Sequence, residues 1–140
     1  MEYDYLKIAG KPAIVTGGGR GIGRATALAL GRFGAKVMIC DVHDDWGESA
    51  VKEIRDHGGV AEYRHCDVAD PEQVKALVAA TVEVFGDVDI LVNNAGIGSV
   101  SLPFEEITDE DWDRMLRVDL TAPFYLCREV IPYMKARQHG

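Results

Sequence analysis

The sequence has 140 residues, of which 47% are hydrophobic and 27% charged, and its formal net charge is −8. A chain of this length suffices for one domain that buries roughly 70% of the surface exposed when unfolded. The acidic balance disfavours nucleic acid and anionic membranes as partners, because both attract positively charged surfaces. It does not exclude an anionic cofactor, since helix N-termini and backbone N–H groups hold phosphate without net positive charge.

Compartment and metal content are predicted from what the sequence lacks. No stretch approaches the roughly 18 apolar residues of a membrane span, and residues 1–10 have no apolar core of a signal peptide. The three cysteines, Cys40, Cys66 and Cys127, show no metal-ligand spacing and lie in or beside apolar runs. We therefore expect a reduced, cytoplasmic protein without a metal site or a membrane partner.

Short apolar runs alternate with helical patterns along the chain. Asp70 is predicted to cap a helix with Gln73 reaching back as its capping-box partner, and Thr108 with Asp111 forms a second such pair before a long helix that reaches Arg137. Glycines follow the other helices. In chain order we predict a strand over 13–16, a helix over 23–33, a strand over 36–40, a helix over 45–57, a strand over 60–66, a helix over 71–85 and a strand over 88–92.

The predicted strands are apolar throughout rather than alternating, which is typical of a parallel sheet covered by helices on both faces. The sequence therefore predicts an α/β fold, a doubly wound parallel sheet of which four strands are present in the order 3-2-1-4. Residues 1–140 are expected to form a single dinucleotide-binding domain that is incomplete and ends before strand five.

The strongest motif is TGGGRGIG, which spans Thr16 to Gly23 between a predicted strand and a predicted helix. Glycines at this place allow a tight turn, close approach of the backbone to a pyrophosphate, and close packing of helix on strand. The alternative is a flexible glycine-rich loop without a ligand. We predict that the cofactor is bound here by Gly17, Arg20, Gly21, Ile22 and Gly23.

Asp41 ends the second predicted strand, 24 residues after Gly17. A carboxylate there can accept hydrogen bonds from the adenosine ribose and would repel a 2′-phosphate, which favours NAD over NADP. Arg20 points weakly the other way, because its guanidinium can meet a phosphate. The alternative for Asp41 is a carboxylate that only caps a loop.

Two further strand ends carry candidate cofactor contacts. Asp67 and Val68 follow the third strand and are placed to meet the adenine, because ligands bind outside the carboxyl ends of parallel strands. Asn94, Ala95 and Gly96 follow the fourth strand, opposite the glycine-rich turn if the order is 3-2-1-4. Small residues there let the backbone approach the cofactor.

Together these motifs resemble the short-chain dehydrogenase/reductase family, whose TGxxxGIG turn and NNAG loop both occur here in order. The resemblance implies a Rossmann-type fold and reversible hydride transfer between a nicotinamide and a small alcohol or carbonyl substrate. It implies Asp41 as the NAD-selecting acid, Asp67 as the adenine contact, and a homo-oligomer, either a dimer or a tetramer.

The family's catalytic Ser and Tyr-x-x-x-Lys lie on strand five and the helix after it, which we expect beyond Gly140. The 140-residue chain alone is therefore predicted to be inactive and to associate through the exposed edge of its fourth strand. The alternative is a non-catalytic dinucleotide-binding or dimerisation module.

The long C-terminal helix raises a question about Asp119, which stands where the family usually has an Asn linked through water to the catalytic Lys. The alternatives are a role in that relay and a carboxylate satisfied by local backbone. Trp46, in the predicted helix over 45–57, is expected to be a packing residue. Asp119 falls on an apolar stripe at helical spacing that we expect to serve the core, and assembly as well, and that consists of Trp112, Met115, Leu116, Leu120, Phe124, Cys127, Ile131 and Met134.

Overall fold

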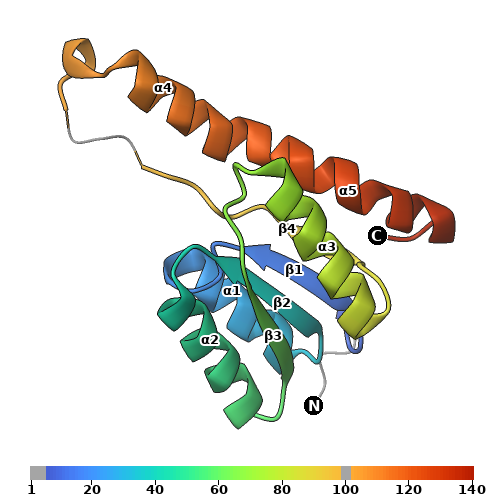
Figure 1. The fold of residues 1–140 in the computed structure, drawn as a ribbon. Helices are drawn as coiled ribbons and strands as arrows, with labels where there is room; N and C mark the ends of the chain where they lie inside the picture. Colours follow the sequence, from blue (N-terminus) through green and yellow to red (C-terminus); the bar gives the residue numbers. More distant parts are fainter. Residues whose placement is uncertain (1–5, 99–101) are drawn as a thin grey trace.

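The computed structural model describes residues 6–98 and 102–140, and its strands form one parallel sheet (Figure 1). The strand order β3-β2-β1-β4 confirms the predicted order and the Rossmann-type α/β class. β4 is shorter than the predicted strand over 88–92 and lies at the edge of the sheet. The strands are β1 (Pro12–Thr16), β2 (Lys36–Asp41), β3 (Val60–His65) and β4 (Ile90–Val92).

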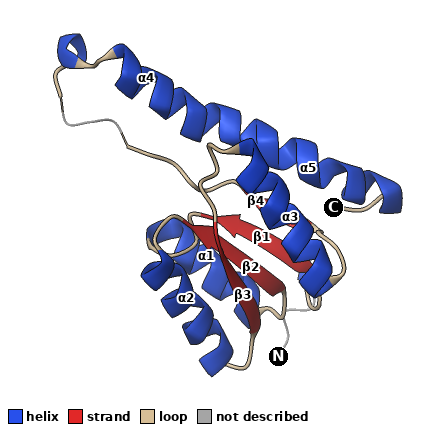
Figure 2. Cartoon of the chain, in the orientation of Figure 1, coloured by secondary structure: helices blue, strands red, loops and turns tan. Residues whose placement is uncertain are grey.

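Helices cover both faces of this sheet (Figure 2). α1 (Gly21–Arg32) and α2 (Asp44–Asp56) pack on one face, and α3 (Pro71–Phe85) and α5 (Ala122–Arg137) pack on the other. The neighbouring β1 residues Ile14 and Val15 are fully buried in opposite layers, Ile14 with α3 and α5 and Val15 with α1 and α2. The strands are therefore apolar without alternation because both of their faces are covered.

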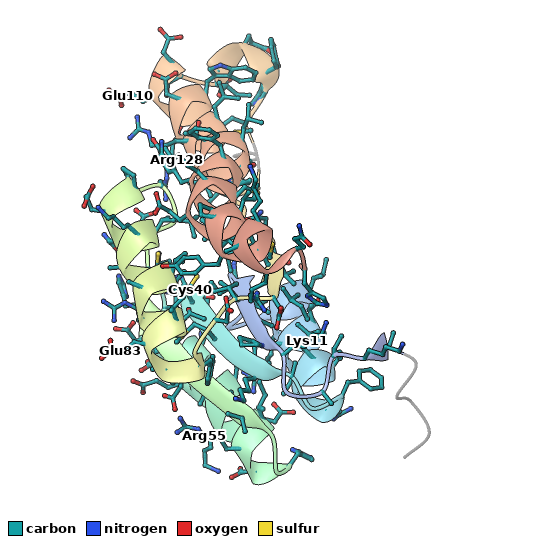
Figure 3. The ribbon with its side chains drawn as sticks, turned by 90° about the vertical axis from the view of Figure 1, so that its right-hand side faces the viewer. Lys11, Cys40, Arg55, Glu83, Glu110 and Arg128 are labelled. Atoms are coloured by element: carbon teal, nitrogen blue, oxygen red, sulfur yellow. The ribbon has the colours of Figure 1, made fainter. Side chains whose placement is uncertain are left out.

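The side chains follow this layering. Cys40 lies inside, between the sheet and the helices, whereas Arg55 and Glu83 lie on the outer surface of α2 and α3 (Figure 3). Within the residues that the structure describes, no helix has the length and apolar character needed to cross a membrane.

The two predicted capping pairs have different outcomes. Thr108 and Asp111 form the reciprocal capping box that starts α4 (Asp109–Leu116), as predicted. Asp70 caps α3 by accepting the backbone N–H groups of Glu72 and Gln73. The predicted return bond from Gln73 to the backbone of Asp70 is wrong, because its side chain instead donates to the Asp70 carboxylate at 3.0 Å and accepts the N–H of Asp67 at 2.9 Å. This side chain ties the end of β3 to the start of α3.

The long C-terminal helix changes its winding in the middle, which the sequence did not predict. A π-helical turn over Arg117–Thr121 joins α4 to α5, and the N–H of Ala122 bonds to the carbonyl of Arg117, five residues earlier. Pro123 follows, and it has no N–H to donate to a carbonyl of the preceding turn. A local change of helical winding accommodates that missing donor. We refer to residues 109–137 as the helical rod.

The predicted apolar stripe of this rod faces mainly away from the core. Leu120 is 67% exposed and Phe124 is 56% exposed, and none of the stripe residues is fully buried. The buried side chains of the rod are instead those of Ala122, Leu126 and Val130, which pack against α3 and the sheet. The expectation that the stripe serves the core of this chain is therefore wrong for most of its residues, although Met134 does pack against the core. The π turn and the sheet select a different side of the helix.

Candidate functional site

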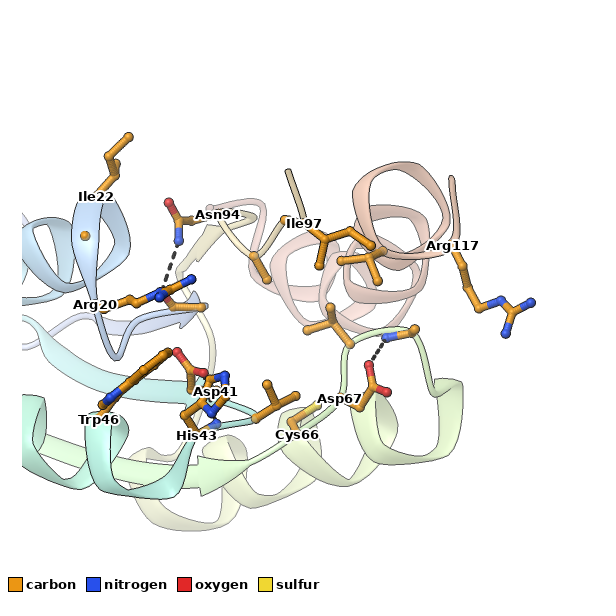
Figure 4. Close-up of a pocket in the computed structure, with 18 of the residues that line it drawn as sticks. Arg20, Ile22, Asp41, His43, Trp46, Cys66, Asp67, Asn94, Ile97 and Arg117 are labelled. Atoms are coloured by element: carbon orange, nitrogen blue, oxygen red, sulfur yellow. Dashed lines mark hydrogen bonds between the residues drawn. The ribbon is translucent and has the colours of Figure 1, made fainter. Parts of the chain in front are cut away.

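A cavity of about 580 Å³ lies at the carboxyl ends of the strands, between the glycine-rich turn and the part of the rod where α4 meets the π turn (Figure 4). This volume is in the range of small-molecule and cofactor sites. The cavity is lined by every predicted cofactor-binding residue except Gly23, namely by Gly17, Arg20, Gly21, Ile22, Asp41, Asp67, Val68, Asn94, Ala95 and Gly96.

The glycine-rich turn leaves no room for a side chain at four of its glycines, which are Gly17, Gly18, Gly19 and Gly23. Gly17 has a φ of +61°, and a Cβ built on it would lie 2.9 Å from the Cα of Ala95. A Cβ on Gly23 would lie 2.2 Å from the Gly17 carbonyl oxygen and 2.4 Å from Nδ2 of Asn94. Gly23 therefore allows close packing of α1 on the turn and on the loop after β4, although it does not line the cavity.

Thr16 and Asn94 join the glycine-rich turn to the loop after β4. The Thr16 hydroxyl accepts the N–H groups of Asn94 and Ala95 at 3.0 and 2.9 Å. The Asn94 amide donates to the carbonyl oxygens of Thr16 and Gly17 at 2.9 and 3.2 Å. The predicted opposition of these two segments is therefore confirmed, but the sequence reasoning missed Thr16 as their junction. The signal that could have identified Thr16 is its place as the first residue of the TGxxxGIG motif.

Asp41 is buried at the end of β2, and its carboxylate is held by two backbone N–H groups. Oδ2 accepts the N–H of Gly19 at 3.0 Å, and Oδ1 accepts the N–H of His43 at 3.1 Å. The loop-capping alternative thus describes part of its bonding. Each carboxylate oxygen has a further lone pair, and the side chain lines the cavity, so it can also accept from a ligand.

The end of β3 is followed by a thiol and an acidic side chain, and the thiol meets a second one from β2. Asp67 is exposed and accepts the N–H of Ala69 at 2.9 Å, while Val68 is buried in the core. Cys66 lines the cavity, and a hydrogen bond with the Cys40 thiol lowers the pKa of Cys66. The same bond, together with burial, raises the pKa of Cys40 well above its usual value. Cys66 is therefore the more acidic thiol of the pair.

A polar cluster at the start of α2 borders the site. Asp44 Oδ1 lies 2.6 Å from the hydroxyl of Tyr63 and 2.8 Å from Nδ1 of His65. These two contacts lower the pKa of Asp44, and burial together with the Asp44 contact raises the pKa of Tyr63.

Across residues 6–98 and 102–140, no group of three or more His, Cys, Asp or Glu side chains is arranged to hold a metal ion.

Asp119 lies in the π turn, exposed and outside the cavity lining. Its Oδ1 accepts the N–H of Ile97 at 2.9 Å, so the carboxylate holds the loop that follows β4. A backbone group therefore satisfies the carboxylate, but this group belongs to the loop after β4, 22 residues away in the chain, and is not local. Because the side chain is exposed, it avoids the burial cost expected from the stripe. A role in a catalytic relay stays a prediction.

Several residues that the sequence reasoning did not select also line the cavity. Trp46, predicted as a packing residue, lies beside Arg20 and Asp41 at one side of it, whereas Arg117 comes from the π turn at the other side (Figure 4). Their positions depend on how α2 and the rod pack, for which the sequence holds no local signal. These additional lining residues are Val42, His43, Trp46, Cys66, Ala69, Ile97, Arg114, Arg117 and Val118.

Comparison with known proteins accounts for this arrangement. The family model described as short chain dehydrogenase matches residues 11–140. The chain belongs to the short-chain dehydrogenase/reductase family. This membership confirms the resemblance found in the motifs, and similar solved structures are in complex with NADP or bound to NAD+.

Individual known proteins are similar to this chain over almost its whole length. An uncharacterized oxidoreductase of Thermotoga maritima is 43% identical over 133 residues, which are 95% of this chain and 52% of that protein. The crystal structure of NAD+-bound xylitol dehydrogenase superposes with a TM-score of 0.91 at 34% identity, over 96% of this chain and 52% of that one. A metagenomic short-chain oxidoreductase in complex with NADP gives a TM-score of 0.90 at 35% identity, over 95% and 60% of the two chains. The chain thus spans about half the length of the curated relatives it matches.

Proposed function

We propose that this chain binds NAD for a short-chain dehydrogenase/reductase that transfers a hydride between the nicotinamide and an alcohol or carbonyl carbon of a small substrate. The observation that carries the proposal is the cavity at the carboxyl ends of four parallel strands, with the carboxylate of Asp41 fixed in its wall. Ligands of open α/β sheets bind at this edge, where the strand order reverses.

The shape of the glycine-rich turn supports a dinucleotide as the ligand. Gly21 has a φ of +56° and open space where a Cβ would be, and the N-terminus of α1 begins there. Backbone N–H groups at a helix N-terminus hold a pyrophosphate. We assign the pyrophosphate to the backbone of residues 17–22 and the adenine to Asp67 and Val68. Bound NAD supplies the hydride-accepting ring, and Ala95 and Gly96 allow its close approach.

The preference for NAD over NADP rests on the bonding of Asp41. Because two backbone N–H groups fix both of its oxygens, the carboxylate cannot turn away from a ligand in the cavity. It can accept bonds from ribose hydroxyls, whereas a 2′-phosphate would meet a like charge. Relatives bind either cofactor, since NAD+ and NADP both occur in the similar structures.

The hydride-transfer activity is a proposal for the whole protein, in which a Ser and a Tyr-x-x-x-Lys beyond residue 140 would orient the carbonyl and move the proton. Residues 1–140 are proposed as its dinucleotide-binding domain, inactive without those groups. The bond from Asp119 to Ile97 supports a role in positioning the loop beside the cavity. We further propose a homo-oligomer, which the exposed apolar side chains of the rod support, and a cytoplasmic location, which the three free cysteines support.

Asp41→Asn tests this assignment when NADH and NADPH binding are measured by titration calorimetry. The variant keeps the side-chain shape but loses the charge, so the ratio of the two dissociation constants should shift towards NADPH by roughly tenfold or more. Asp45→Asn is the matched control, because Asp45 is exposed in α2 and outside the cavity lining. Tighter binding of NADPH than of NADH by the unmodified chain would contradict the NAD assignment.

A further inference from the structure

An aromatic and basic cluster lies next to Asp41 on the cavity wall. The guanidinium carbon of Arg20 lies 4.5 Å from the centre of the Trp46 ring, which is a cation–π distance. The other side of the cluster is His43, whose ring centre lies 3.9 Å from that of Trp46. All three side chains line the cavity together with Asp41 (Figure 4).

The turn backbone fixes how close this cluster is to the carboxylate. A Cβ built on Gly19 would lie 2.8 Å from Asp41 Oδ2 and 2.8 Å from the Trp46 Cβ. Gly19 thus brings the carboxylate and the indole to the same point of the turn, one residue before Arg20. Arg20 is exposed, and the contact that the structure shows for its guanidinium is the face of the Trp46 ring.

The stacked guanidinium keeps its hydrogen-bonding edge available. Within the described part of the chain, Arg20 forms no ion pair with Asp41 or with any other carboxylate, and its guanidinium makes no hydrogen bond. Stacking uses the flat face of the group, whereas its N–H donors point outwards in the plane. Such a fork matches the oxygens of a phosphate.

Asp41 and Arg20 therefore have opposite effects on the binding of a 2′-phosphate. The carboxylate accepts from ribose hydroxyls and disfavours a 2′-phosphate, while a guanidinium held beside it offsets part of that repulsion. Without the indole, Arg20 is free to move into solvent or to pair with Asp41, and in either case its donors leave the ribose position.

We propose that Trp46 is a specificity-determining positioning residue, which holds Arg20 at the ribose 2′ position and thereby sets how strongly the chain binds NADP relative to NAD. This inference rests on the dinucleotide binding proposed above. It assigns the residual affinity for NADP to the stacked pair and not to Arg20 alone, so the ring of Trp46 matters although it need not touch the phosphate.

Dissociation constants for NAD and NADP, measured by calorimetry on the unmodified chain, Trp46→Ala, Trp46→Phe and Arg20→Ala, test the proposal. Trp46→Ala should weaken NADP binding roughly tenfold and NAD binding less than about twofold. Trp46→Phe keeps an aromatic face and should retain most of the NADP affinity. Adding Arg20→Ala to Trp46→Ala should cause little further loss, because the indole acts through the guanidinium.

A spectroscopic readout separates this role from a merely structural one. The sequence has two tryptophans, and Trp112 lies on α4 outside the cavity lining, so Trp112→Phe leaves Trp46 as the only indole. In that background NADP should change the Trp46 emission more than NAD does, because the 2′-phosphate contacts the Arg20 guanidinium that is stacked on the indole. Equal emission changes and equal losses of both affinities in Trp46→Ala would overturn the proposal. If the unmodified chain binds neither dinucleotide, the proposed function itself is wrong.

Discussion

The carboxyl edge of the sheet and the helical rod differ in how fully their groups are satisfied within this chain. At the sheet edge, Thr16, Asn94 and Asp41 each bond to backbone groups of another segment or of their own turn. In the rod, neither α4 nor the π turn has a buried residue, and α5 buries three side chains. Large apolar side chains such as Leu120 and Phe124 are left exposed.

This difference separates a region whose geometry is fixed by contacts within the chain from one whose apolar surface is not covered by those contacts. The sheet edge is built by contacts between segments that the chain itself contains, so its shape is preorganised for a ligand. The rod presents apolar surface that packing within residues 6–98 and 102–140 does not cover. These exposed apolar side chains are the observation behind the homo-oligomer proposed above.

The largest expected effect separates two leucines of the rod that lie on different sides. Leu126 is 1% exposed and packs on α3 and the sheet, so Leu126→Ala should lower the free energy of unfolding by about 2–5 kcal/mol. Leu120 is 67% exposed, and Leu120→Ala should change it by less than about 0.5 kcal/mol. Urea denaturation of both variants measures the contrast. Equal losses would mean that the exposed side is packed in solution.

The next effect tests the preorganised edge. Gly23→Ala forces a methyl group against the Gly17 carbonyl and the Asn94 amide, so the unfolding free energy should fall by about 1–3 kcal/mol and dinucleotide binding should be lost. Gly98→Ala is the control, because a Cβ there meets no atom within 4 Å. Thermal denaturation and NADH titration report the two quantities. Normal NADH binding by Gly23→Ala would show that the turn is free to rearrange.

The sequence was sufficient to predict how the segments at the sheet edge are arranged, but it was insufficient to predict which side of the rod packs on the sheet. The glycine-rich turn, Asp41 and the NNAG loop have local signals, so strand order and cavity lining followed from residue types and spacing. The stripe of the rod also has a clear helical period, but the period cannot say which side meets the sheet. Trp46 was missed for a related reason, because its contact with Arg20 arises from the packing of α2 against the turn.

A smaller effect concerns the junction between the end of the rod and the segment that precedes β4, at the amino end of the strand. Arg137, at the end of the rod, pairs with Asp87 at 2.6 Å and Asp89 at 2.7 Å and donates to the carbonyl of Val88 at 2.9 Å. Arg137→Gln should therefore lower the unfolding free energy by about 1–2 kcal/mol, since these bonds involve charged groups. Arg128→Gln, on the exposed side of the same helix, should cost less than about 0.5 kcal/mol. Both free energies are measured by urea denaturation. Equal losses in the two variants would mean that the bonds of Arg137 do not stabilise the fold.

The smallest effect is a pH dependence at the sheet edge. Hydrogen bonds from Gln73 and from two backbone N–H groups lower the pKa of Asp70. A lowered folded-state pKa stabilises the fold above the unfolded value of about 3.9, and this contribution is lost as the pH falls through the folded pKa. Asp70→Asn should thus lower the melting temperature by a few degrees at neutral pH, with the difference shrinking below about pH 4. Asp45→Asn is the control, and a difference that stays constant with pH would contradict the role of the Asp70 charge.

Hydrogen–deuterium exchange of the chain with and without NADH tests the central claim most directly. If the sheet edge is the cofactor site, NADH should slow amide exchange over residues 17–23, 41–46 and 94–97 and leave the α5 part of the rod unchanged. Protection confined to the rod, or no protection at NADH concentrations that saturate a dehydrogenase, would contradict the assignment of this edge as the dinucleotide site.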